Sequence, residues 1–174
     1  MKSLLTAACC FALAALPLMA QEKKAEKSAM TDQEFVTFAA QTDMVEANLA
    51  QLAQNVASAQ PVKDYAQMLA TDHTADYQKL SGIAQQANLT FPNAISEENN
   101  KKMIDPFQKL KGAAFDHRYA AEMVAGHTKA LEIFKKEAND AQNPALKDYA
   151  SQTIPALEKH LAGAKDLEKA KASK

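Results

Sequence analysis

The chain has 174 residues, which is enough for one domain with a sizeable core. Hydrophobic residues make up 47% of it, alanine is abundant, and there are only four glycines and no tryptophan, a composition that favours α-helix. The formal net charge is −1 and Arg118 is the only arginine, so the basic surface that a nucleic-acid partner requires is absent.

The first 20 residues have the pattern of a cleaved signal peptide. Lys2 is followed by an apolar run that ends at Leu18, and Ala20 occupies the expected cleavage position. The run is too short for a convincing spanning helix. We therefore expect an exported protein, periplasmic or associated with the outer membrane, whose mature chain has no transmembrane segment.

Two cysteines in this leader leave a lipoprotein open as the less favoured alternative. Leu5 lies one place too far from Cys9 for the usual lipoprotein motif, and the apolar run before Cys9 or Cys10 is very short. If the leader is cut after Ala20, both cysteines leave with it. The mature chain then has no disulfide, and its stability comes from packing.

Residues 21–30 are rich in Lys, Glu and Ala without apolar periodicity, so we predict a disordered tether there. A helical bundle is predicted over residues 31–170. Thr31 and Glu34 form a capping-box pattern at its start, and apolar residues then recur with helical spacing to about Ala57.

A second helix begins near Pro61, a residue suited to the first helical position, and its apolar stripe continues to Ala87. Residues 88–106 break the pattern with Pro92 and a polar cluster, and a short helix is expected after Ser96. This connection is long for a compact domain.

The third helix is expected from about residue 113 to 138 and the fourth from 145 to about 167, with a turn at Asn143 and Pro144 between them. Pro155 lies inside the fourth helix. Because proline removes one helical hydrogen bond and crowds the preceding turn, we expect a kink or a strained turn near Ser151.

Two of the expected helices open on related pentapeptides, VKDYA at residues 62–66 and LKDYA at residues 146–150. The chain is therefore predicted to be all-α: a four-helix bundle made of two helical hairpins, with the long connection between helices two and three. The repeat favours a ferritin-like arrangement, in which that connection runs the length of the bundle.

Each predicted helix carries one polar residue near its middle, on or beside its apolar stripe: Glu46, His73, His127 and His160. Counted outward from the two tight turns, the members of each hairpin lie level to about one residue, or about 1.5 Å. The four therefore share a central layer. Asp76 also points inward, one turn beyond His73.

This layer has two interpretations. Imidazoles suit transition metals, so the histidines with Glu46 and Asp76 could hold one divalent ion such as Zn, Fe, Cu or Mn. Alternatively, Glu46 accepts hydrogen bonds from the histidines and the layer only fixes the helix register, as in a structural or envelope-stress interaction protein.

Short sequence phrases in all four predicted helices carry a family resemblance. They are FAA at 38–40 with Glu46, Met68 with Asp72-His73, Phe115-Asp116 with Met123-Val124 and His127, and Pro155 with His160-Leu161. Through them, residues 35 to about 167 resemble a bacterial exported family catalogued as domain of unknown function number 4142. The resemblance implies a ferritin-like bundle in an exported protein and no established reaction.

The ligand pattern departs from that of ferritin-like proteins that bind two irons. Those proteins use a Glu on each of two helices and a Glu-x-x-His on each of the others. Here Asp72 and Asp76 flank His73, and His160 has no Glu three residues earlier. The chain also lacks a nucleophile elbow, a glycine-rich phosphate loop and a cysteine metal motif. It gives no positive sign of an enzyme and identifies no protein partner.

Overall fold

The computed structural model describes residues 30–172, so the predicted signal peptide and residues 21–29 of the tether lie outside the described residues. Within that range the chain is helical and contains no strand, which confirms the all-α prediction. Its four long helices are α1 (Asp32–Val56), α2 (Gln60–Gln86), α4 (Gly112–Asp140) and α5 (Pro144–Ala172). None of the helices in residues 30–172 is long and apolar enough to cross a membrane.

The helix ends follow local chemistry. At the start of α1 the Glu34 amide donates to Thr31 Oγ1 at 3.2 Å and the Thr31 amide donates to Glu34 Oε2 at 2.8 Å, so the predicted capping box is present. Beyond α2, Asn88 adopts a left-handed φ of 55° that stops the helix. Gly112 has a φ of 59°, and it allows the sharp entry into α4.

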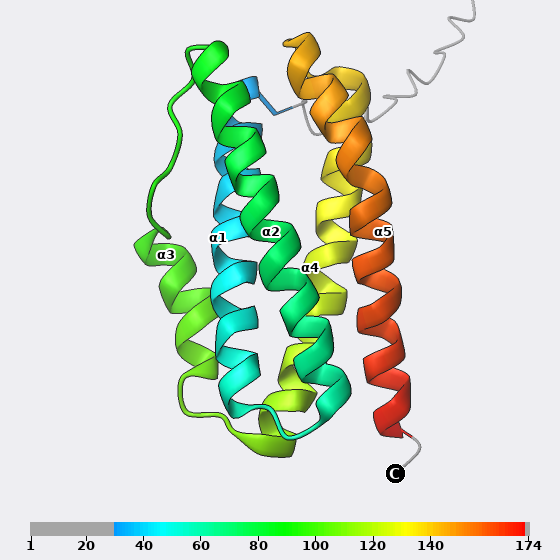
Figure 1. Cartoon of the computed structure of the whole chain (residues 1–174). Coiled ribbons are helices and arrows are strands. Elements are labelled where there is room, and N and C mark those ends of the chain that lie inside the picture. Colours follow the sequence, from blue (N-terminus) through cyan, green and yellow to red (C-terminus); the bar gives the residue numbers. More distant parts are fainter. Residues whose placement is uncertain (1–29, 173–174) are drawn as a thin grey trace, which may run out of the picture.

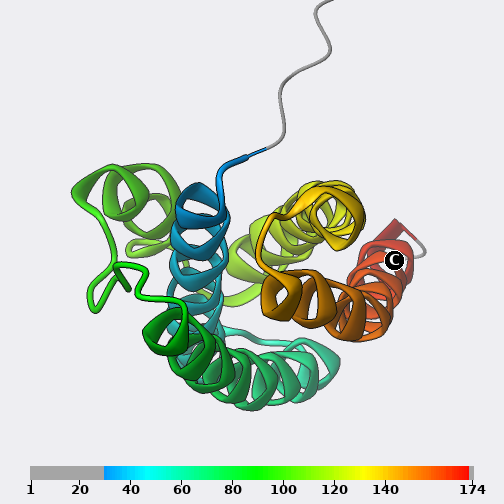
Figure 2. The same cartoon turned by 90° about the horizontal axis from the view of Figure 1, so that it is seen from above.

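Two antiparallel hairpins build the molecule, α1 with α2 and α4 with α5 (Figure 1). The connection between α2 and α4 returns along the full length of the bundle, so α2 and α4 run in the same direction. Seen from above, each helix of one hairpin faces a helix of the other, α1 facing α4 and α2 facing α5 (Figure 2).

The connection contains three short helical pieces on the outer side of α1: α3 (Glu97–Asn99), the π-turn η1 (Asn100–Ile104) and the 3₁₀ turn η2 (Asp105–Phe107). Phe107 is fully buried and packs with its ring 5.7 Å from that of Phe115 in α4. This contact fixes the end of the connection to the core.

Two glutamines of α1 bind the extended part of this connection. The Gln33 amide group both donates to the Thr90 carbonyl and accepts from the Thr90 N–H, each at 2.8 Å. Two turns later, Gln41 donates to the Ala94 carbonyl and accepts from the Ser96 N–H, again at 2.8 Å. These side chains satisfy backbone groups that have no helix or sheet to pair with.

The core consists of two apolar clusters, one toward each end of the bundle. One cluster includes Leu49, Leu69 and Tyr119, and the other includes Phe35 and Phe134. The polar layer predicted from the sequence lies between them. Its surroundings are therefore low in polarity on both sides, which strengthens electrostatic interactions within the layer.

The helix α5 continues through Pro155 without a break in its helical residues, and the kink or strained turn near Ser151 stays a prediction. Pro155 has no N–H to donate to the Ser151 carbonyl. Both residues lie on the exposed side of α5, where water can bind that carbonyl.

Candidate metal centre

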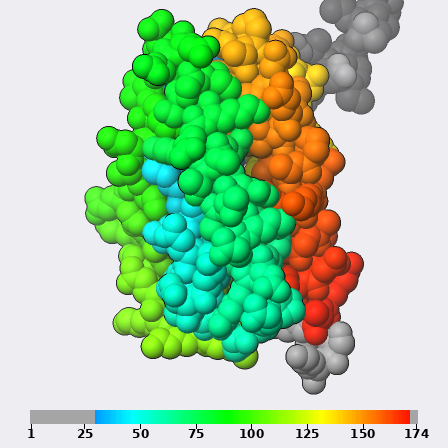
Figure 3. Space-filling view, viewed as in Figure 1, coloured from blue at the N-terminus to red at the C-terminus, as the bar shows by residue number. Residues whose placement is uncertain are grey.

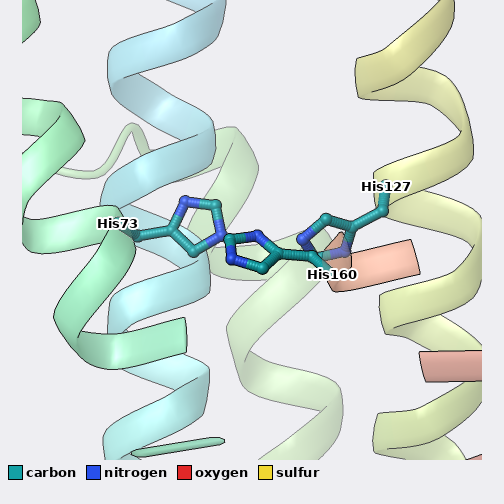
Figure 4. A group of neighbouring side chains, drawn as sticks. All are labelled: His73, His127 and His160. Atoms are coloured by element: carbon teal, nitrogen blue, oxygen red, sulfur yellow. The ribbon is translucent and has the colours of Figure 1, made fainter. Parts of the chain in front are cut away.

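The four residues of the predicted layer come from four different helices and are all buried. Glu46 of α1 is 6% exposed, His73 of α2 4%, His127 of α4 1% and His160 of α5 2%. The three imidazoles point toward one another from α2, α4 and α5 (Figure 4). Each helix presents its residue from the face that packs on its neighbours, as the apolar periodicity indicated.

The three imidazole rings form a compact triangle. Their centroids lie 5.7 Å apart for His73 and His127, 5.3 Å for His73 and His160, and 5.2 Å for His127 and His160. If one nitrogen is taken from each ring, the three nitrogens lie within 4.8 Å of one another. Metal–nitrogen bonds of about 2.0–2.1 Å would draw these donor atoms to about 3.4 Å from one another, a displacement that side-chain rotation can supply.

A hydrogen bond to the protein orients each ring. His73 Nδ1 donates to Asp43 Oδ1, His160 Nε2 donates to Asp72 Oδ2, and His127 Nδ1 donates to the Met123 carbonyl, all at 2.9 Å. This is the arrangement of metal-binding histidines, in which an acceptor on one ring nitrogen leaves a lone pair on the other.

The remaining ring nitrogens are buried and have no hydrogen-bond partner among the described residues: His73 Nε2, His127 Nε2 and His160 Nδ1. Glu46 Oε2 is in the same condition. Buried polar atoms without a partner are uncommon, since each costs roughly 1–3 kcal/mol. Four such atoms lie in this one layer, so the described residues do not satisfy its hydrogen-bonding groups.

Glu46 lies beside the triangle without bonding it. Its Oε1 is 4.0 Å from His127 Nδ1, too far for a hydrogen bond, and that nitrogen already donates to the Met123 carbonyl. Gly126 makes room for the carboxylate, because a Cβ there would lie 3.1 Å from Glu46 Oε1. Burial raises the pKa of Glu46 to about 7.

The histidines differ in protonation. Burial, with the positive charge of His73 nearby, lowers the pKa of His127 to about 3, and burial also lowers the pKa of His160. For His73, burial favours the neutral ring, but the hydrogen bond to Asp43 and the charge of Glu46 outweigh it and raise the pKa. Two of the three rings are therefore held neutral at pH 7, the form that binds a metal.

Asp76 does not join the triangle. It lies one turn from His73, but its Oδ2 accepts a hydrogen bond of 2.6 Å from the Tyr149 hydroxyl. The carboxylates that hold the rings are instead Asp43 and Asp72. Asp43 is a site residue that was not predicted from the sequence, although its position one turn before Glu46 on the same helix is a usable signal.

Comparisons with known proteins give a fold and a family. No curated protein matches the sequence. Among solved structures, CopM in its Cu(II)-bound form is similar with a TM-score of 0.69 and 16% identity, over 82% of this chain and 98% of that one. CopM in its Ag-bound form has a TM-score of 0.65 and 16% identity, over 80% of this chain and 96% of that one. CopM in its Cu(I)-bound form gives 0.65 and 14%, with the same coverage. At these identities the likeness shows the fold alone.

The model of the family described as domain of unknown function (DUF4142) matches residues 17–167, and the chain belongs to that family.

Proposed function

We propose that this protein binds one transition-metal ion in its central layer, with His73, His127 and His160 as nitrogen ligands and Glu46 as a carboxylate ligand. One observation carries the proposal: three buried imidazoles face one another, each held by an acceptor on one nitrogen and unpartnered on the other. The ion would supply the partner that these nitrogens lack.

A hydrogen-bonded layer without an ion fits the geometry less well. In that alternative Glu46 would accept hydrogen bonds from the histidines, but its nearest contact with a histidine nitrogen is 4.0 Å. The rings donate outward instead, to Asp43, Asp72 and the Met123 carbonyl. The free nitrogens of the two neutral rings, His127 and His160, are lone-pair acceptors and cannot satisfy each other.

The types of ligand in the proposed site indicate which metal ions it would bind. Three imidazoles with one carboxylate, and no cysteine in residues 30–172, match Cu, Zn and Fe better than Mg or Ca. Among first-row ions such a site binds Cu²⁺ most tightly, with Zn²⁺, Fe²⁺ and Mn²⁺ as the other candidates. CopM, which has a similar fold, is known in Cu(II)-, Cu(I)- and Ag-bound forms, so copper is the first ion to test.

The test is a thermal-shift titration with Cu²⁺, Zn²⁺, Fe²⁺ and Mn²⁺ on untagged, chelator-treated protein. An ion that binds only the folded state should stabilise it by about 2.7 kcal/mol when free metal is 100 times the Kd. His127→Ala should abolish that rise. His117→Ala removes an exposed histidine of the same helix and should leave it intact.

Elemental analysis should give one ion per chain for wild type and for His117→Ala. A metal response that survives His127→Ala would place the ion elsewhere. If wild type binds none of the four ions, the layer is a polar register and the proposal is wrong.

We further propose that the hairpins form a ferritin-like bundle over residues 31–170, and that residues 1–20 are a cleaved signal peptide for export to the periplasm or outer membrane. The lengthwise connection between α2 and α4 supports the first proposal, and the apolar leader supports the second. The N-terminal sequence of the exported protein should begin at Gln21. A start at Cys9 or Cys10 would identify a lipoprotein instead.

A further inference from the structure

A cavity of about 330 Å³ opens between α2 and α5 and leads to the candidate metal centre. Its lining includes two of the three clustered histidines, His73 and His160. The two helices border each other along the face shown in Figure 3. The cavity therefore connects the central histidine layer to the junction of α2 and α5, where the two hairpins meet.

Carboxylates line this cavity at graded depth. The Asp72 side chain is 38% exposed, Asp76 is half-buried, and Asp43 is 4% exposed. Lys79 is the one lysine or arginine in the lining, and its Nζ donates to Gln152 Oε1 at 3.0 Å. Three carboxyl groups and one ammonium group therefore line the cleft, and ionised carboxylates in a cleft attract cations and disfavour anions.

Atoms that could receive a cation lie at the inner end. Asp43 Oδ2, His73 Nε2 and His160 Nδ1 are all buried without a hydrogen-bond partner among residues 30–172, and all three residues line the cavity. Asp72 and Asp76 are four residues apart on α2 and so share a face of that helix. A cation bound first by these two carboxylates has Asp43 along its way to the histidines.

We propose that the cavity between α2 and α5 is the route by which the metal cation enters and leaves, with Asp72 and Asp76 as an outer cation-binding station. This inference rests on the proposed function, because it assigns a path to the ion bound there. It also gives Asp76 a role in capture of the ion, away from the three nitrogen ligands.

Two other cavities approach the layer and suit a cation less well. One of about 350 Å³, between α1, α2 and residues 93–95, reaches His73 and contains Asp43 as its one carboxylate. The other, of about 170 Å³, lies beside Glu46, reaches no histidine and contains Lys129. The route between α2 and α5 has more carboxylates and reaches more of the ligands than either.

The experiment measures metal association and dissociation rates by stopped-flow absorbance with Cu²⁺, after the equilibrium Kd of wild type has been determined. Ala156→Phe narrows the proposed route from its α5 wall. Ala75→Phe does so from the exposed α2 wall, and serves where the first variant fails to fold. Ala47→Phe is the matched control, since Ala47 lines the other cavity that reaches His73.

Blocking the route should slow association and dissociation by the same factor, about tenfold or more, and leave the Kd unchanged. Ala47→Phe should change neither rate. Asp76→Asn should slow association and weaken its dependence on ionic strength, as steering by charge requires.

The inference is wrong if Ala47→Phe slows metal association while Ala156→Phe and Ala75→Phe do not. It is also wrong if all variants bind the metal at the wild-type rate. Wild type that binds no Cu²⁺ at equilibrium, and no Zn²⁺, Fe²⁺ or Mn²⁺, would overturn the proposed function together with this route.

Discussion

The two hairpins match each other at a spacing of 84 residues, and the match extends to their contacts. Asp32 accepts hydrogen bonds from the N–H groups of Gln142 and Asn143, in the turn of the second hairpin. Asp116, its counterpart 84 residues later, accepts from the N–H groups of Ser58 and Ala59, in the turn of the first. Each hairpin thus caps the turn of the other.

The tyrosines of the related pentapeptides also reach across. Tyr65 donates to the carbonyl of His160 at 2.9 Å, and Tyr149 donates to Asp76 Oδ2 at 2.6 Å. His160 lies 84 residues after Asp76, so the two bonds join equivalent positions. The equivalence extends the repeat of the two pentapeptides from sequence to hydrogen bonds.

The hairpins differ in the central layer. Asp43 and Asp76 of the first correspond to His127 and His160 of the second, while Glu46 and His73 of the first correspond to Ala130 and Leu157. The two hairpins therefore share their turn contacts and differ in the chemistry of the central layer. The first hairpin supplies the carboxylates and one imidazole, and the second supplies two neutral imidazoles.

The largest expected effect concerns the shared core. Leu69→Ala in the first hairpin and Phe134→Ala in the second should each lower the free energy of unfolding by about 2–5 kcal/mol, because each empties a buried site. Glu132→Ala, at an exposed position, should stay within about 0.5 kcal/mol. Chemical denaturation followed by circular dichroism should show one transition. Two transitions in either core variant would mean that the hairpins unfold as separate units.

The next effect concerns charge in the first hairpin. Burial raises the pKa of Glu46 from 4.5 to about 7, so ionising it costs folding free energy, and its contribution falls as pH rises through this interval. In metal-free protein, Glu46→Gln should remove up to about 3 kcal/mol of this pH dependence, measured by denaturation at several pH values.

His127 of the second hairpin should show the opposite sign. Its pKa is lowered from 6.5 to about 3, so its contribution to stability falls as pH decreases below 6.5. If the free energy of unfolding changed with pH in the same way for wild type and Glu46→Gln, the raised pKa of Glu46 would be contradicted.

A third expectation concerns the carboxylate that orients His73. Asp43→Asn replaces the acceptor of the Nδ1 hydrogen bond and should weaken metal binding by about 10–100-fold, measured by competition titration. Asp148→Asn, at an exposed position of α5, is the matched control and should leave the Kd unchanged. Because the Asn amide oxygen can still accept this hydrogen bond, an unchanged Kd in Asp43→Asn would show that the negative charge of Asp43 does not contribute to metal binding.

The smallest effects test the reciprocal turn caps. Asp32→Ala and Asp116→Ala should each cost about 1–2 kcal/mol in the free energy of unfolding, because each leaves two turn amides without an acceptor. The sites lie at opposite ends of the bundle, so the costs should add in the double variant. A cost confined to one of them would show that the caps are not equivalent.

Much of this architecture could be predicted because it depends on local signals. The apolar stripes predicted the helices, and Thr31 with Glu34 predicted the first helix cap. Residue counts from the two turns predicted that His73, His127 and His160 lie at the same height along the bundle. Height along an antiparallel hairpin follows directly from the helical rise.

The hydrogen-bond partners could not be predicted in the same way. The direction of a carboxylate depends on the side-chain rotamer and on the rotation of each helix, which sequence spacing leaves free. Asp76 points inward as expected but bonds Tyr149, and Asp43 holds His73 although only its position near Glu46 hinted at it. The helix α5 also continues through Pro155, where the exposed Ser151 carbonyl can bind water in place of the missing N–H.

The paired glutamine contacts of α1 have a consequence for how copies of this chain behave together. Hairpins joined by a long, loose connection can exchange between two molecules, each hairpin packing on the partner's counterpart. Here Gln33 and Gln41 hold Thr90, Ala94 and Ser96 at two points, so the connection lies against its own α1. Opening it would break four hydrogen bonds before an exchange could start. These glutamine contacts therefore favour pairing of the two hairpins within one chain. The ligands of the site then all come from a single molecule.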